Sequence, residues 1–65
     1  MGDTVRLVRS GWREDQDYLV AELDGQAICQ CYVPCGTSAT AGLEDHMVVI
    51  RDDDGRLLAS APTPM

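Results

Sequence analysis

One short segment limits the possible folds of this sequence more than any other. Asp24-Gly25 lies between two runs of β-prone residues, 18–23 and 26–33. A two-residue Asp-Gly turn takes positive φ at both positions, and it joins antiparallel strands whose twist it matches. The apolar side chains on either side recur with period two and not with period 3.6. The segment therefore predicts a β-hairpin and argues against a mainly helical fold.

The same turn predicts the register of the hairpin, with Leu23 opposite Gln26 and Ala21 opposite Ile28. One face is then apolar apart from Glu22 beside the turn. It is expected to be core and carries Tyr18, Val20, Ala27, Cys29, Cys31 and Val33. The other face mixes apolar and amide side chains: Leu19, Ala21, Leu23, Gln26, Ile28 and Gln30. This second face is expected to be only half covered.

A second hairpin is predicted from residues 46–52 and 56–61, which flank Asp53-Asp54-Gly55. Glycine at the end of a three-residue loop suits a type I turn followed by a bulge. Asp52 is then expected opposite Arg56.

The remaining segments give weaker signals. Residues 4–9 alternate in part, and residues 12–17 indicate a polar loop with one aromatic anchor, Trp12. Residues 35–45 are small and aperiodic, and predict either a connection or a short helical turn near Leu43. The expectation is an all-β fold, a small five-stranded antiparallel meander or open barrel built from two hairpins. A single domain is assigned to residues 1–61 and an extended tail to residues 62–65.

Chain length and net charge exclude several classes of function. A chain of 65 residues buries only about 60% of its unfolded surface, so small domains usually add disulfides, a metal or a partner. The net charge of −6 argues against binding nucleic acid or an anionic membrane. The N-terminus shows no secretion signal, and no apolar run is long enough to span a membrane. We therefore expect a cytoplasmic or virion location, in which the thiols are reduced.

The three cysteines form a C-x-C-x-x-x-C pattern. A zinc site would take Cys29, Cys31 and Cys35 with His46 as the fourth ligand, but this spacing is not that of a zinc knuckle. Cys29 and Cys31 point to the same face of a strand, the face expected to be core, where a free cysteine packs as a small hydrophobe. Core packing without metal is the favoured interpretation, and zinc binding is the second. A disulfide from Cys35 to one of the other two cysteines is the third. No cofactor is expected.

Two further patterns resemble chemical sites but lack the necessary partners. The run from Asp52 to Gly55 begins like a calcium loop, yet the twelfth position is Thr63, where a bidentate Glu is needed. His46, the only histidine, has no nucleophile in a recognisable motif. The chain is therefore not expected to be an enzyme.

Binding to another protein is the remaining class. Aromatic residues dominate interface hot spots, and the half-covered face offers an apolar surface. The residues expected to contact a partner are Trp12, Leu19, Leu23, Ile28 and Tyr32. The first hypothesis is a structural or accessory subunit of a larger assembly, such as a capsid cement or connector protein of a virion, with a homo-oligomer as one form of that assembly. The alternatives are a small acidic inhibitor of a basic site and a small metal-thiolate protein.

Overall fold

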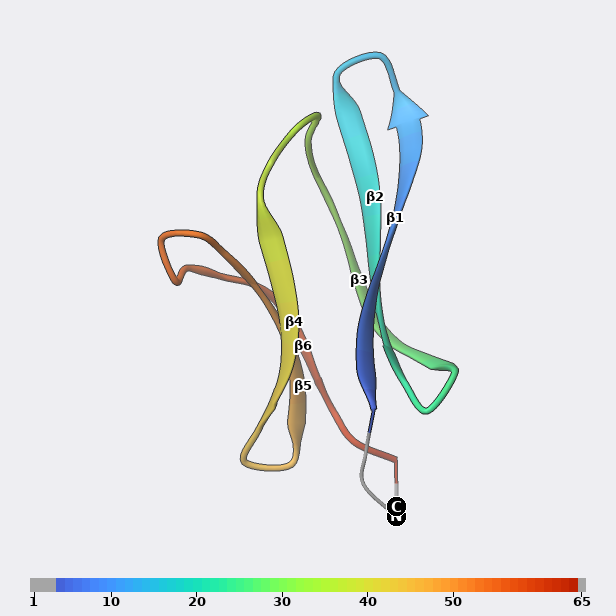
Figure 1. The fold of residues 1–65 in the computed structure, drawn as a ribbon, viewed down its shortest axis with the longest axis vertical. Coiled ribbons are helices and arrows are strands. Elements are labelled where there is room, and N and C mark those ends of the chain that lie inside the picture. The colour runs from blue at the N-terminus through green and yellow to red at the C-terminus, as the bar shows by residue number, and fades with distance from the viewer. Residues whose placement is uncertain (1–3, 65) are drawn as a thin grey trace.

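A computed structural model describes residues 4–64. All the regular secondary structure in that range is β-strand (Figure 1). The six strands are β1 Val5–Arg13, β2 Gln16–Leu23, β3 Gln26–Pro34, β4 Ala39–Glu44, β5 Met47–Asp52 and β6 Leu57–Pro62. They form two antiparallel sheets, in the orders β1-β2-β3 and β4-β5-β6. The all-β expectation is confirmed. The strands number six and not five, and they make two three-stranded meanders in place of one meander or an open barrel.

The two predicted turns are present. Asp24 and Gly25 have φ of 52° and 88°, so both central residues adopt the left-handed conformation of a type I′ turn. Asp24 also binds the start of β1, because its carboxylate accepts from the Thr4 N–H at 2.9 Å. In the second hairpin Gly55 has φ of 84°, and the Asp52 N–H donates to the Arg56 carbonyl at 3.0 Å. Asp52 and Arg56 therefore lie opposite each other, as expected.

β4 replaces the expected aperiodic connection. Residues Ala39–Glu44 pair with β5 throughout their length, and the turn between the two strands is Asp45-His46. Both turn residues have positive φ, 47° and 64°, so this is a third tight hairpin, built without glycine. Similarly, β1 and β2 extend into the expected polar loop and leave only two residues, 14 and 15, between them.

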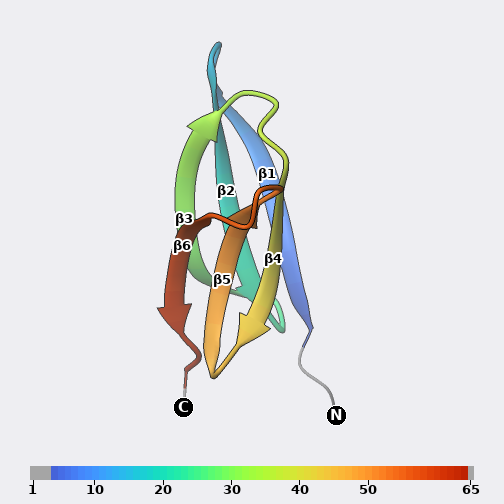
Figure 2. The same cartoon turned by 90° about the vertical axis from the view of Figure 1, so that its left-hand side faces the viewer.

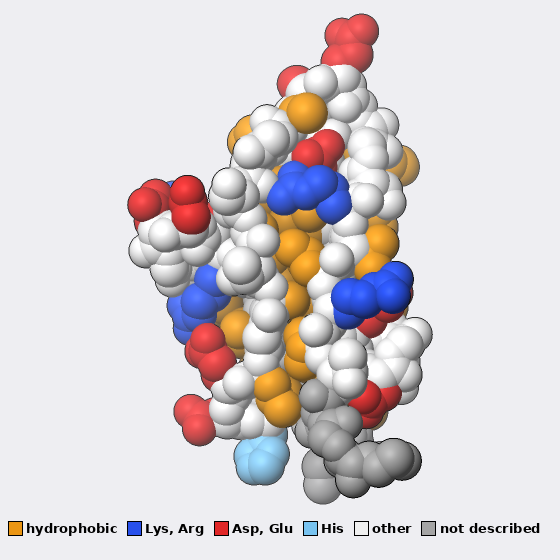
Figure 3. Space-filling model, in the orientation of Figure 1, with side chains coloured by type: hydrophobic (Ala, Val, Ile, Leu, Met, Phe, Trp, Pro, Cys, Tyr) orange, Lys and Arg blue, Asp and Glu red, His pale blue; other side chains and the backbone are white. Residues whose placement is uncertain are grey.

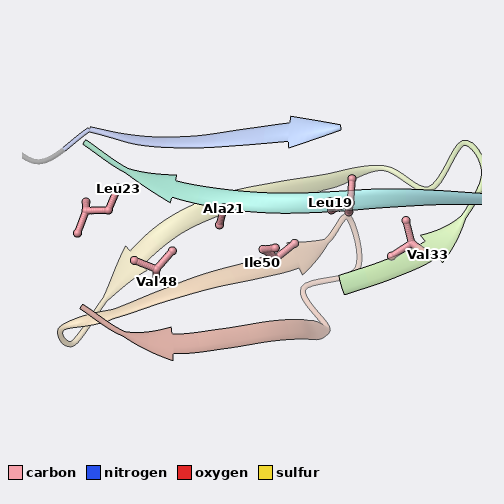
Figure 4. Packing of buried hydrophobic residues seen from close by; sticks show 6 residues of the cluster. All are labelled: Leu19, Ala21, Leu23, Val33, Val48 and Ile50. Carbon is pink, nitrogen blue, oxygen red and sulfur yellow. The ribbon is translucent and has the colours of Figure 1, made fainter. Parts of the chain in front are cut away.

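The two sheets stack face to face (Figure 2). β1 packs over β4, β2 over β5, and β3 over β6. Hydrophobic side chains fill the space between the sheets along its length (Figure 3). The core side chains come mainly from the two central strands and point toward one another (Figure 4): Leu19, Ala21, Leu23, Val33, Val48 and Ile50. The architecture is thus a small β-sandwich with one thin core.

The predicted faces of β2 were wrong, and one residue explains why. Leu23 pairs with Gln26 as expected, but Ala21 pairs with Cys29 and not with Ile28. Ile28 is the extra residue of a β-bulge, which shifts every later pair by one. A shift of one residue exchanges the faces of a strand. The inner face of β2 is therefore Leu19, Ala21 and Leu23, while Tyr18 and Val20 lie on the outer face.

The expected core face of β3 is confirmed after the bulge, where Cys29, Cys31 and Val33 pack against the core, but it was wrong for Ala27, which lies before the bulge and is exposed. β6 continues one residue into the expected tail, to Pro62, and the Thr63 N–H donates to the His46 carbonyl at 2.9 Å. The start of the segment assigned as a tail is thus held against the β4–β5 turn.

Candidate functional site

Three aromatic side chains form a cluster on the outer face of the β1-β2-β3 sheet. Tyr18 and Tyr32 are directly opposite in the β2–β3 ladder, and their ring centroids lie 5.1 Å apart. Trp12 comes from the end of β1, with its ring centroid 5.5 Å from that of Tyr32. Trp12 is 54% exposed and Tyr32 is 51% exposed. We call Trp12, Tyr18 and Tyr32 the aromatic cluster.

Local backbone irregularity positions the tryptophan. The β1–β2 register shifts between Gly11 and Arg13, so Trp12 is the extra residue of a bulge. A bulge redirects a side chain out of the regular alternation of the strand. The Tyr18 hydroxyl donates to the side-chain carbonyl of Gln30 on β3, which orients its ring. Tilted aromatic pairs at such distances each contribute about 0.5–1.5 kcal/mol beyond the area they bury.

The five residues expected to contact a partner are divided by the structure. Trp12 and Tyr32 lie together in the aromatic cluster, on the surface. Leu19 is fully buried and Leu23 is 9% exposed, so their expected place on a half-covered face was wrong, for the register reason given above. Ile28 is half-buried in its bulge and packs against the core.

Tyr18 is a surface residue that the sequence analysis placed in the core. The tyrosine pair across β2 and β3 follows only from the bulged register, because the unbulged register puts Tyr18 and Tyr32 on opposite faces. One sequence signal points to this pair: Tyr18 and Tyr32 lie equally far from the Asp24-Gly25 turn once one bulged residue is allowed on β3.

An ion pair lies on the inner face of the same sheet, near the aromatic cluster. Arg9 donates to the carboxylate of Asp17 at 2.6 Å, and also to the Thr37 carbonyl. The Gly36 N–H donates to the same carboxylate at 3.3 Å. The Arg9 guanidinium, and then the Gly36 N–H, hold the pKa of Asp17 below its ordinary value of 3.8. Asp17 is the buried charged residue of the described chain, and these partners satisfy it.

The three cysteines and His46 do not converge on one point within the part of the chain that the structure describes. Among residues 4–64, the one group of three or more possible ligand side chains that converge is Asp52, Asp53 and Asp54. The thiols are free; Cys29 and Cys31 are half-buried and Cys35 is exposed. Burial raises the pKa of the Cys29 and Cys31 thiols, which disfavours the thiolate, the form that attacks electrophiles and binds metals.

The three aspartates are explained by the turn that they form. Asp52 Oδ1 accepts from the Asp54 N–H at 3.0 Å and from the Arg56 N–H at 2.9 Å. Side-chain oxygens of aspartate commonly close turns in this way. Asp52 is half-buried and Asp53 and Asp54 are exposed, and the group resembles a capped hairpin more than an ion-binding loop.

A shallow hollow lies at the end of the sandwich far from the aromatic cluster. Its volume is about 270 Å³, below the 300–1,000 Å³ typical of small-molecule sites. Seven residues line it: Leu23, Asp24, Gln26, Leu43, His46, Thr63 and Pro64. The Asp24 carboxylate in this lining accepts from the Thr4 N–H, and no hydrogen bond to the His46 side chain is found among the described residues, so we make no catalytic assignment here.

No helix long and apolar enough to cross a membrane occurs within residues 4–64. Comparison of the chain with models of protein families, with curated proteins and with solved structures gave no match in any of the three. The aromatic cluster, chosen on its geometry and exposure, is thus the best-supported candidate site.

Proposed function

We propose that the chain is a non-enzymatic accessory subunit of a larger protein assembly, and that it binds its partner through the aromatic cluster. A virion protein such as a capsid cement or connector subunit is the most concrete form of this proposal. The observation that supports it is the exposure of Trp12 and Tyr32, each about half accessible, on one sheet face of a 7.1 kDa chain.

Energetics favour a protein-binding role for this cluster. Tryptophan and tyrosine are the residues most enriched in interface hot spots, and they combine large apolar area with a polar edge. Each Å² of apolar surface removed from water contributes about 25 cal/mol. The Tyr18 ring is held by its hydrogen bond to Gln30 and by its contact with the Tyr32 ring, so less side-chain entropy is lost when a partner covers this pair.

Charge favours a basic protein partner. The chain carries −6, so a positively charged partner is attracted, whereas phosphate groups of a nucleic acid are repelled. An arginine on the partner would also stack on an exposed indole or phenol ring, a contact that gains about 0.5–2 kcal/mol. The proposed partner surface is therefore flat, partly apolar and rich in arginine.

The test compares the distribution of the protein between free and assembled forms. Extracts of the source, expressing a tagged chain, are separated by mass, and the fraction in a large complex of fixed stoichiometry is measured. Trp12→Ala/Tyr32→Ala is expected to shift the chain to the free fraction. Leu57→Ala, which truncates another exposed apolar residue on the other sheet, is the matched control and is expected to stay assembled. A wild-type chain found wholly free would contradict the proposal.

An acidic inhibitor is the second candidate, supported by the carboxylates at two hairpin tips. Glu14 and Asp15 are exposed between β1 and β2, and Asp53 and Asp54 are exposed between β5 and β6. Such tips could occupy a basic site on a target by charge mimicry. The two functions differ in the degree of their salt dependence: binding of an inhibitor through ion pairs alone is expected to be lost at high ionic strength, while aromatic docking keeps its apolar contribution there.

A further inference from the structure

The two strands along one side of the sandwich contain no charged residue. β3 (Gln26–Pro34) and β6 (Leu57–Pro62) are edge strands of their sheets, and neither contains Asp, Glu, Arg or His. A quarter of the chain is charged, and the opposite edge strand β1 alone holds three of the five arginines. Charged side chains flank the gap between the sheets on the β1/β4 side (Figure 3).

Uncharged edges are unusual because proteins normally place charges there to prevent strands of other chains from pairing. The bulge at Ile28 protects the start of β3, and the register shift between Ile50 and Arg51 marks another bulge near the start of β6. Pro34 and Pro62 end the two strands. The central stretches, residues 29–33 and 59–61, are left as regular edges able to pair.

The two edges lie together on the same side of the molecule and pack on each other (Figure 2). Their midpoints are also at the same level. The Cys29 thiol donates to the Val48 carbonyl at 3.7 Å, and Val48 pairs with Ala61 of β6. One residue further along each strand lie Gln30, the middle of β3, and Ser60. A single two-fold axis perpendicular to the sheets can therefore pair β3 and β6 with their counterparts at once.

We propose that this chain forms a symmetric dimer in which β3 and β6 each pair, antiparallel, with the same strand of a second copy. Charge selects a second copy as the occupant. Two chains of −6 repel each other, and the β3/β6 side is the one where close approach brings no like charges opposite one another, whereas self-pairing of β1 would face arginines with arginines. The result would be a sandwich of two six-stranded sheets.

A standard interface takes about 800 Å² from each partner, which is less than a fifth of the 4518 Å² surface of the chain. A two-fold interface is self-complementary, so the same edge serves as both donor and acceptor. The dimer is held by main-chain pairing of β3 and β6 and not by the rings of the aromatic cluster, although Tyr32 lies within the pairing stretch of β3.

Gln30→Glu is the decisive variant. It places two carboxylates near the two-fold axis, and it keeps an acceptor for the Tyr18 hydroxyl that Gln30 now binds. Gln16→Glu makes the same chemical change on the central strand β2, and is the matched control. By analytical ultracentrifugation the wild type is expected to sediment as a dimer, Gln30→Glu to raise the dimer Kd by about tenfold or more, and Gln16→Glu to leave it unchanged.

A second pair of variants tests the same interface on β6, so that the result does not depend on Gln30→Glu folding correctly. Ser60→Glu on β6 is expected to weaken the dimer as well, and Thr40→Glu on the opposite edge strand β4 is not; both residues are exposed. Circular dichroism confirms that each variant is folded. A wild type that stays monomeric up to about 1 mM overturns the proposal, as does equal weakening by the β3/β6 variants and their controls.

Discussion

Arg9 and Asp17 form an ion pair on the inner face of the β1-β2-β3 sheet, with 2.6 Å between Nη1 and Oδ2. Asp17 is nearly buried and sits in the ladder between Gly11 and Val33. A buried carboxylate is tolerated where its oxygens are hydrogen-bonded, and here a guanidinium and a backbone N–H serve that purpose. The pair joins β1, β2 and the β3–β4 connection in one contact.

This pair predicts a loss of stability in acid. The pKa of Asp17 is lower in the fold than its ordinary 3.8, mainly through Arg9, so folding favours the ionised form. The stabilisation is complete above the unfolded pKa and disappears as the pH falls below about 4. Asp17→Asn should therefore lower the melting temperature at pH 7 and flatten its decline between pH 5 and 2.

Glu44→Gln is the comparison for that experiment. Arg51 likewise lowers the pKa of Glu44, but the Glu44 side chain is 49% exposed against 12% for Asp17, so solvent screens the pair. Its effect on the acid transition should be smaller. An acid dependence of Asp17→Asn identical to that of the wild type would show that the ion pair adds nothing.

The thiols are predicted to react in a fixed order. Cys35 is exposed, whereas Cys29 and Cys31 are half-buried and burial raises the pKa of both. The reactive species is the thiolate, so these two should be alkylated much more slowly at pH 7.5. Mass spectrometry of iodoacetamide-treated protein should show one fast modification at Cys35. Equal rates at all three would mean that β3 does not hold its inner face against the core.

The β4–β5 turn offers a stabilising substitution. Asp45 and His46 both have positive φ, a conformation that costs an ordinary residue about 1–2 kcal/mol. Asn-Gly is the preferred pair for a type I′ turn, so Asp45→Asn/His46→Gly should raise the free energy of unfolding by about 1 kcal/mol, less the entropy that glycine adds to the unfolded chain. Urea unfolding measures this gain. Gly25→Ala, at a φ of 88°, should lower the free energy of unfolding. If Asp45→Asn/His46→Gly lowered it as well, the assignment of the β4–β5 turn would be contradicted.

Local chemistry explains which parts of the fold could be predicted. Asp24-Gly25 and Gly55 mark their turns because few residues adopt positive φ, and both hairpins are present. β4 was missed because its inward side chains Ala39 and Ala41 are too small to show an apolar alternation, and because its turn lacks glycine. The bulge at Ile28 also has no marker, since Ala27, Ile28 and Cys29 are all apolar.

The same bulge limited the prediction of the site. Trp12 and Tyr32 were identified from residue type alone, since large aromatics are common anchors. Assigning the faces of β2 needed the register, and tertiary packing chose it: with the bulge, Leu19 and Ala21 join Cys31 and Val33 in one core. No rule of turn geometry gives that result, because a bulge is favoured only by what it buries.

The corrected faces predict that Leu19 and Trp12 have opposite roles. Leu19 is fully buried, so Leu19→Ala should cost about 2–5 kcal/mol of unfolding free energy, most of the stability of so small a domain. Trp12→Ala removes a half-exposed ring and one aromatic contact, so it should cost about 1 kcal/mol but weaken partner binding. Thermal unfolding and the assembly assay, run on both variants, separate the two effects. If Leu19→Ala kept its stability, or Trp12→Ala lost as much as Leu19→Ala, the inner and outer faces assigned to this sheet would have to be exchanged.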